Sequence, residues 1–294
     1  MQIKNMMRND RSGVSTILVA VIIIVVVVVA AAAVYVVLSD KEDTRTIAPG
    51  TVVTYDLTIF GTVYASTLTE EYLGQSASQY FVKMTEMQGL SGTVEYGVEP
   101  KGLPEDGRKT GNIEMDTIDG KKNLEIWEYT TIINGMEASV KAYVDPSNGL
   151  PYRMEIVDYG TVMVLKEYDL KWQDSYEESD AIGMKYEYTG TSGKVIMECI
   201  ADCLDGKYGV TFGAESYFLS DYPQGLPTDA VNTGLTDTLI NTIDGNVDVQ
   251  IWKFESTEGT TLFYFDPVSH ITYRLAISDL SGATAIVDLT SKPS

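Results

Sequence analysis

The sequence has few of the residues that carry most catalytic and metal-binding chemistry. It contains a single histidine, His270, and only two cysteines, Cys199 and Cys203, among 294 residues. One histidine excludes a zinc site with several histidine ligands, and two cysteines exclude a scaffold held by many disulfides. No glycine-rich phosphate loop and no serine-centred nucleophile motif stands between a strand and a helix. We therefore expect no enzyme activity, no metal and no cofactor.

Positive charge is also scarce. The chain has 21 lysine and arginine residues against 42 aspartate and glutamate residues, which gives a formal net charge of −21 at pH 7. A field this negative disfavours nucleic acid as a partner and is typical of a well-solvated surface. We expect no nucleic-acid partner.

One long apolar run stands near the N-terminus. Residues Ile17 to Leu38 carry no charge, and the run is long enough to cross a bilayer as one helix. Three basic residues precede it, whereas the residues that follow it are mainly acidic, so the N-terminus should stay in the cytoplasm. A cleaved signal peptide is the alternative, since small residues occur at Ala30 to Ala33, but the apolar run continues beyond them. A retained signal anchor is favoured, with a tail at 1–13, a transmembrane helix at 14–38 and a linker at 39–49.

The residues around this run also carry a resemblance. Arg11 to Thr16, RSGVST, stand directly before the apolar helix, and this arrangement resembles the N-terminus of archaeal type IV pilin-like proteins. The resemblance implies cleavage after Gly13 by a prepilin-type peptidase and a role as a minor pilin-like subunit. Many members of that family have an acidic residue at the fifth position after the cut, where this chain has Leu18.

The rest of the chain repeats itself. The recurring motifs keep their order: Gly102-Leu103-Pro104 and Gly225-Leu226-Pro227, Thr117-Ile118-Asp119-Gly120 and Thr242-Ile243-Asp244-Gly245, Ile126-Trp127 and Ile251-Trp252, Asp145-Pro146 and Asp266-Pro267, Tyr152-Arg153 and Tyr273-Arg274. A preserved order at similar spacing predicts two tandem repeats, at 50–170 and 183–290. The polar, acidic segment at 171–182 is predicted to link them.

Each repeat has the pattern of short strands joined by tight turns. In the first repeat the expected strands are 51–59, 62–72, 79–87, 113–118, 123–132, 137–144, 151–158 and 161–169. Asp119-Gly120 and the turn at 145–149 supply the backbone angles that hairpins need. Such short connections make neighbouring strands antiparallel, so we predict an all-β ectodomain. The stretch from 90 to 112 is expected to be the longest loop.

The strand with the repeated tryptophan is apolar on both faces. Trp127 and Tyr129 lie on one face in the first copy, and Trp252 and Phe254 do so in the second. A strand that is apolar on both faces is covered on both. These four aromatic residues are candidate ligand-facing residues, although a core role is the simpler interpretation. The covered face is a filled core, a seam between the repeats or a groove.

One hairpin carries a second resemblance. Tyr143 to Glu155, YVDPSNGLPYRME, is similar to a hairpin of bacterial lipoprotein-carrier and lipoprotein-sorting proteins. The resemblance implies a curved antiparallel half-barrel that holds acyl chains on its concave side. It therefore suggests a hydrophobic ligand.

The cysteines and the histidine have simple interpretations. Cys199 and Cys203 are expected on one strand, where residues four apart are too distant for a disulfide, so we predict buried, unpaired side chains. His270 falls in a turn and is expected to be solvated. Together these patterns predict a single-pass, membrane-anchored surface or envelope protein with a non-enzymatic binding or structural role. The alternatives are a carrier or sensor of a lipid-like ligand and a minor pilin-like subunit; the possible partners are a hydrophobic ligand and an envelope protein.

Overall fold

The computed structural model describes most of the chain after residue 45. The described ranges are 46–59, 62–88, 91–101, 106–133, 136–190, 193–213, 216–221, 223–235, 238–257 and 259–293. The predicted transmembrane helix at 14–38 and the predicted cleavage site at Gly13 lie outside them. Within these ranges, no helix has the length and apolar character needed to span a bilayer.

The first half of the chain folds into one antiparallel sheet, which we call the first sheet. Its strands are β2 (Val52–Ile59), β3 (Thr62–Gln75), β4 (Gln79–Gln88), β5 (Ser91–Pro100), β6 (Arg108–Thr117), β7 (Gly120–Ile133), β8 (Met136–Val144), β9 (Pro151–Ile156) and β10 (Thr161–Asp169). Their pairing order is β5-β4-β3-β2-β10-β9-β8-β7-β6. A short 3₁₀ helix, η1 (Val157–Tyr159), joins β9 to β10.

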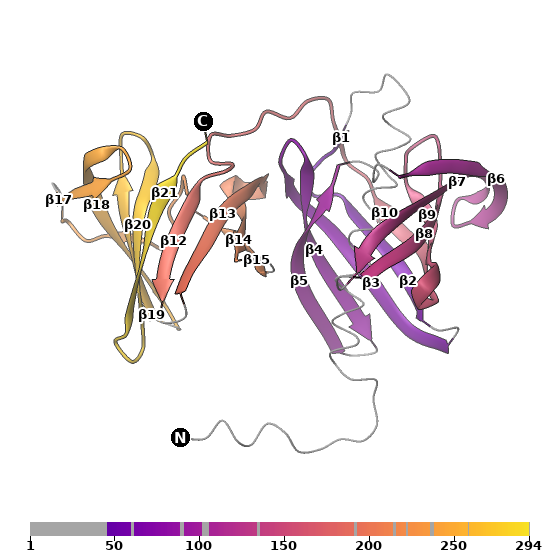
Figure 1. Cartoon of the computed structure of the whole chain (residues 1–294), viewed down its shortest axis with the longest axis horizontal. Coiled ribbons are helices and arrows are strands. Elements are labelled where there is room, and N and C mark those ends of the chain that lie inside the picture. Colours follow the sequence, from indigo (N-terminus) through magenta and orange to yellow (C-terminus); the bar gives the residue numbers. More distant parts are fainter. Residues whose placement is uncertain are drawn as a thin grey trace, which may run out of the picture.

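The second half forms the second sheet in the same way. Its strands are β12 (Lys185–Gly190), β13 (Gly193–Cys203), β14 (Tyr208–Phe212), β15 (Ser216–Ser220), β16 (Val231–Asn232), β17 (Thr238–Thr242), β18 (Gly245–Ser256), β19 (Gly259–Asp266), β20 (Ile271–Asp279) and β21 (Thr284–Ser291), with η2 (Leu204–Gly206) between β13 and β14. The order is β15-β14-β13-β12-β21-β20-β19-β18, and β18 also pairs with β16 and β17. The strand order of the first sheet is thus found again in the second (Figure 1). Duplication as its origin stays a prediction.

The all-β, antiparallel class predicted from the sequence is confirmed for the described residues. The expected strands of the first repeat coincide with β2, β3, β4 and β6 to β10 within a few residues. The prediction of a long loop from 90 to 112 is wrong, because β5 and the start of β6 occupy most of that stretch. Two inward positions of β5 are Gly97 and Glu99, which are both buried, so the strand lacks the apolar alternation that would have marked it.

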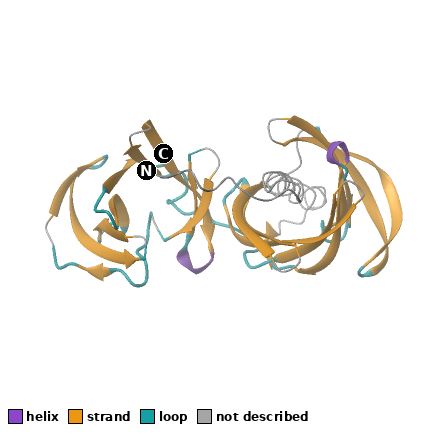
Figure 2. Cartoon of the chain, turned by 90° about the horizontal axis from the view of Figure 1, so that it is seen from below, coloured by secondary structure: helices purple, strands orange, loops and turns teal. Residues whose placement is uncertain are grey.

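Each sheet is curved (Figure 2), and each has its own cluster of buried apolar side chains. In the first sheet Tyr55, Leu68 and Met154 are among the fully buried residues of this core. Tyr186 and Leu275 hold similar places in the second sheet. Burial of each such side chain stabilises the fold by roughly 1.5–3 kcal/mol.

The two sheets meet along β3 and β13. Asp202 is paired with Gln75, and Cys203 is paired with Gly74. The Tyr176 hydroxyl, from the predicted linker, lies 2.8 Å from the Gln75 carbonyl oxygen and 2.6 Å from Asp202 Oδ2. The linker is therefore hydrogen-bonded to both sheets.

Two further strands flank the first sheet. β1 (Thr46–Ile47) pairs with β11 (Trp172–Gln173), so the segment before the first sheet and the segment after it run side by side. Ile47 is buried in the core of the first sheet. The segment predicted as a linker at 39–49 thus includes a short strand that is part of the folded domain.

Candidate functional site

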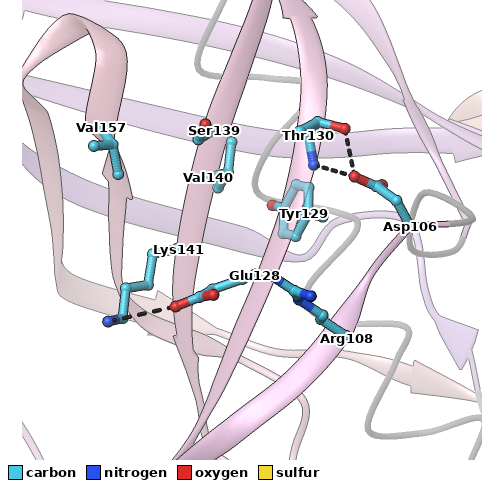
Figure 3. Close-up of a pocket in the computed structure, with 9 residues that line it drawn as sticks. All are labelled: Asp106, Arg108, Glu128, Tyr129, Thr130, Ser139, Val140, Lys141 and Val157. Carbon is cyan, nitrogen blue, oxygen red and sulfur yellow. Dashed lines mark hydrogen bonds and ion pairs between the residues drawn. The ribbon is translucent and has the colours of Figure 1, made fainter.

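The main candidate site is a pocket of about 470 Å³ on the first sheet (Figure 3). It lies over β6, β7 and β8 and reaches the start of η1. Its lining consists of Asp106, Arg108, Glu128, Tyr129, Thr130, Ser139, Val140, Lys141 and Val157. Its volume is within the usual range for a small-molecule site, about 300–1,000 Å³.

The strand register places a row of alternating charges across this pocket. Glu128 on β7 stands opposite Arg108 on β6 and opposite Lys141 on β8. The Lys141 Nζ lies 3.6 Å from Glu128 Oε1. Directly opposed side chains on an antiparallel pair are near enough to interact. The pocket therefore presents two cations on either side of one carboxylate, and Arg108 is exposed to solvent.

The rim of the pocket is fixed by two other carboxylates. Asp106 accepts hydrogen bonds from the Thr130 backbone N–H, at 2.8 Å, and from the Thr130 hydroxyl. The Thr130 hydroxyl, followed by the backbone bond, lowers the pKa of Asp106. Asp158 accepts a hydrogen bond of 2.6 Å from the Ser139 backbone N–H. These bonds tie β7 and β8 to the segments beside them, so the rim is ordered.

Two of the lining residues, Tyr129 and Val140, direct their side chains into the core, on the opposite face of β7 and β8 from Glu128 and Lys141. Tyr129 and Val140 are buried, and burial, followed by the charge of Glu99, raises the pKa of Tyr129 well above its usual value. The phenol stays neutral at physiological pH and does not act as a base. Arg108, Lys141 and the polar groups of the rim are therefore suited to binding a ligand that carries a carboxylate.

The second sheet lacks this set of charges. Its register places Val231 and Leu262 opposite Lys253, at the positions that Arg108 and Lys141 hold opposite Glu128. The charged row is thus specific to the first sheet. In the sequence, the signal for this site is the difference in charge between Arg108, Glu128 and Lys141 and the corresponding residues Val231, Lys253 and Leu262.

The four predicted aromatic residues fall into two groups. Trp127 and Tyr129 are buried in the core of the first sheet, with 8% and 4% of their surface exposed. Trp252 and Phe254 are half-buried and pack against the core of the second sheet. Of the four, only Tyr129 lines the pocket. Each indole is held by the side chain two residues earlier, since Trp127 Nε1 donates to Glu125 at 3.2 Å and Trp252 Nε1 to Gln250 at 3.3 Å.

The repeated polar motifs serve the fold. The Tyr152 hydroxyl donates to Asp119 Oδ2 in the first sheet, and the Tyr273 hydroxyl donates to Asp244 Oδ2 in the second. Each aspartate stands in a hairpin turn whose glycine has a positive φ of 90°. The shared tyrosine and aspartate therefore tie this turn to the sheet.

The remaining candidates have structural surroundings. Cys199 is buried and Cys203 is partly buried, and both are free thiols on β13. Burial raises the pKa of both thiols, that of Cys203 to about 12, which keeps them protonated and poorly nucleophilic. His270 is exposed at a turn with a φ of 58°, where the first sheet has Gly149.

Comparisons with known proteins identify no family. No family model matches the sequence, and no curated protein matches it. Among solved structures, "Crystal structure of MucB in complex with MucA(peri)" aligns with a TM-score of 0.28 at 10% identity, over 87% of this chain and 92% of that chain. "The complex structure of Pseudomonas aeruginosa MucA/MucB" aligns with a TM-score of 0.29 at 9% identity, over 88% and 92%. Similarity this low sets neither the fold nor the function of this chain.

Proposed function

We propose that this chain is a membrane-anchored, extracytoplasmic binding protein without enzymatic activity, and that the pocket of the first sheet is its binding site. The proposal rests on one observation. Arg108, Glu128 and Lys141 line a pocket where the second sheet, with the same strand order, has Val231, Lys253 and Leu262. The fold does not require the charged row, so we assign it to binding.

The ligand class follows from the charges. The chain as a whole has a net charge of −21, whereas the charged residues that line the pocket are balanced, with Arg108 and Lys141 against Asp106 and Glu128. A guanidinium binds a carboxylate through two parallel hydrogen bonds, which gives both strength and orientation. We propose a small polar ligand, or a side chain of a partner protein, that carries a carboxylate and contacts Arg108.

The surroundings of the reactive groups support binding rather than catalysis. The two thiols are held protonated by burial, and the buried Tyr129 stays neutral. Asp106 is occupied by its hydrogen bonds to Thr130.

Substitution toward the second sheet tests the pocket. We expect Arg108→Val to weaken the binding of succinate, used as a dicarboxylate probe, by at least about tenfold, because one charge-assisted pair is lost. The measurement is a titration followed by NMR of the full chain in nanodiscs. Lys121→Gln, in an exposed pair with Glu114, is the matched control and should bind as the wild type does. Equal binding by wild type and Arg108→Val would reject this site.

The proposed membrane anchor and the orientation of the chain can be tested separately. If residues 14–38 anchor the chain with its C-terminal part outside, protease added to intact cells should remove both sheets and leave the N-terminal tail. A reporter epitope at the C-terminus would follow the loss. A C-terminal epitope that survives in intact cells, but not in lysed cells, would contradict the proposed orientation.

A further inference from the structure

Two glutamates are fully buried inside the first sheet. Glu70 on β3 and Glu99 on β5 both have no exposed surface. The Tyr72 hydroxyl donates to Glu99 Oε2 at 2.9 Å. Among the residues that the structure describes, three carboxyl oxygens, Glu70 Oε1, Glu70 Oε2 and Glu99 Oε1, have no hydrogen-bond partner. Buried carboxyl oxygens without donors are rare in folded proteins, so this cluster needs an explanation.

The two carboxyls face the same side of the sheet and are surrounded by aromatic rings. Glu70 stands opposite Val53 and Met84, and Glu99 stands opposite Tyr80. The Tyr72 and Tyr80 rings pack edge to face, with centroids 5.4 Å apart. β5 is an outer strand in the pairing order of the first sheet, so the cluster lies near an edge of the sheet rather than at its centre.

The second sheet shows that the fold does not need these acids. Gly50 N–H bonds to the Tyr72 carbonyl, and Gly183 N–H bonds in the same way to the Cys199 carbonyl, which fixes the correspondence of the two sheets. Met197 then takes the place of Glu70. Ser220, opposite Tyr208, takes the place of Glu99, opposite Tyr80.

Burying an unpaired polar group costs roughly 1–3 kcal/mol, and an ionised one costs more. An apolar replacement of similar volume is often neutral or stabilising. Since the second sheet keeps the same strand order without the two acids, their presence in the first sheet is a cost to stability that folding does not explain. A bound group that donates hydrogen bonds to them would remove this cost.

The chemistry of the cluster selects the kind of group. Among the residues that the structure describes, no set of three acidic, histidine or cysteine side chains is arranged to hold a metal ion. A primary ammonium has three N–H donors, which equals the number of unpartnered oxygens. Aromatic faces also attract cations, and Tyr55 and Tyr72 are buried in the same cluster.

We propose that Glu70 and Glu99 bind the protonated primary amine of a ligand on the inner face of the first sheet. This site is separate from the Arg108 pocket and goes beyond the carboxylate binding proposed there. In the empty site, burial raises the pKa of both carboxyls, that of Glu99 to about 8, so the pair holds a proton at neutral pH. The ammonium replaces that proton, and binding at pH 7 should therefore release protons to the buffer.

The test uses hexylamine, with hexanol as the probe of equal chain length without the charge. In the full chain in phosphatidylglycerol nanodiscs, calorimetry should show hexylamine binding at least about tenfold more tightly than hexanol. Glu70→Met/Glu99→Ser, which introduces the residues of the second sheet, should bind the two probes alike. Glu71→Gln is the matched control, because Glu71 is adjacent on β3 but is partly exposed and pairs with Lys83 at 2.9 Å. Equal binding of the two probes by the wild type, or undiminished hexylamine binding by the double variant, overturns the proposal.

Two further measurements complete the test. Carbon-13 NMR of the wild-type carboxyls should show Glu70 and Glu99 shifting with hexylamine and not with hexanol; no shift overturns the proposal even if the double variant fails to fold. Repeating the titration in phosphatidylethanolamine nanodiscs identifies the source of the amine. Weaker apparent hexylamine binding there means that the lipid headgroup competes for the site, and unchanged binding means that the site takes a free amine.

Discussion

The two sheets share one strand order and differ in what they enclose. Glu70 and Glu99 are buried in the first sheet, where Met197 and Ser220 stand in the second. The Arg108 pocket likewise has no charged counterpart on β16 and β19. The residues that the two sheets share stabilise the common fold. The residues that differ mark the proposed binding sites of the first sheet.

The two sheets also make the same kind of contact at a turn, but with lysines from different parts of the chain. Asp119 accepts a hydrogen bond from Tyr152 and has Lys122 Nζ at 3.8 Å. Asp244 accepts one from Tyr273, and its lysine is Lys292, from the end of the chain. The cation beside the turn thus comes from β7 in the first sheet and from the segment after β21 in the second. Hydrogen bonds from Tyr152 and then Tyr168 lower the pKa of Asp119, and hydrogen bonds from Lys292 and then Tyr273 lower the pKa of Asp244.

The largest effect is expected when the two buried glutamates of the first sheet are replaced by the corresponding residues of the second sheet. Glu70→Met/Glu99→Ser should stabilise the first sheet by about 3 kcal/mol at pH 8. The pKa of Glu99 is raised by burial from its ordinary value of 4.5 to about 8. The folded state thus holds this proton more tightly than the unfolded state, so the contribution of Glu99 to stability is greatest below about pH 4.5 and is lost as the pH rises through 8.

Urea unfolding at pH 4.5, 6 and 8 measures this difference. The double variant should lose most of the pH dependence between 4.5 and 8, whereas Glu71→Gln should keep it. A wild-type protein that is more stable at pH 8 than at pH 4.5 would show that the buried pair is not protonated as described.

The second prediction concerns a substitution that should disrupt the contact between the two sheets. A Cβ on Gly209 would lie 2.5 Å from the Phe81 ring, so Gly209→Val should destabilise the junction by about 2 kcal/mol. Gly111→Ala is the control, since its added Cβ meets only Ile126 at 4.0 Å. Calorimetry should show the variant unfolding in two separate transitions and the control as the wild type does. A single unchanged transition for Gly209→Val would mean that Phe81 moves aside freely.

The third prediction tests whether the shared turn contact has equal weight in both sheets. Asp119→Asn weakens an acceptor for the Tyr152 and Tyr168 hydroxyls, and Asp244→Asn weakens one for the Tyr273 hydroxyl; each should cost about 1 kcal/mol, because the amide oxygen still accepts hydrogen bonds. The loss should be smaller for Asp119→Asn, because Lys122 keeps its bond of 2.6 Å to Asp145, whereas Lys292 loses its carboxylate partner. Thermal unfolding of the two variants gives the comparison. A larger loss for Asp119→Asn would reverse this ranking.

The smallest expected effect concerns the pocket. Lys141→Leu introduces the residue of the second sheet, Leu262, and removes an exposed pair with Glu128. Such pairs contribute little, so stability should change by less than about 0.5 kcal/mol. The same urea series measures it, with Lys166→Gln, whose pair with Asp56 on β2 is also exposed, as the control. A loss above about 1 kcal/mol would make Lys141 part of the scaffold rather than of the site.

Local chemistry made much of the fold predictable. Asp-Gly turns and the turn after Asp145 fix hairpins over a few residues, so the strands beside them were placed within a few positions. β5 was missed because two of its inward residues are Gly97 and Glu99. Its pattern depends on neighbours on other strands, which no short window of sequence contains.

The candidate sites were harder to predict for the same reason. Glu70 and Glu99 are 29 positions apart and appear in the sequence as ordinary surface carboxylates in an acidic chain; only the pairing of β3, β4 and β5 brings them together. Arg108 and Lys141 meet through β7 in a similar way. Of the aromatic residues proposed from the sequence, Tyr129 reaches the pocket, while Trp127 is part of the core.

The pairing of the first and last strands of each sheet has a consequence for engineering and for gene rearrangement. β2 pairs with β10, and β12 pairs with β21, so the start and the finish of each sheet are hydrogen-bonded neighbours. A short peptide could join them and new ends could be opened at any hairpin, which makes each sheet a candidate for circular permutation. A unit of this kind is also easily excised and fused elsewhere, because each sheet is built from consecutive strands of the chain.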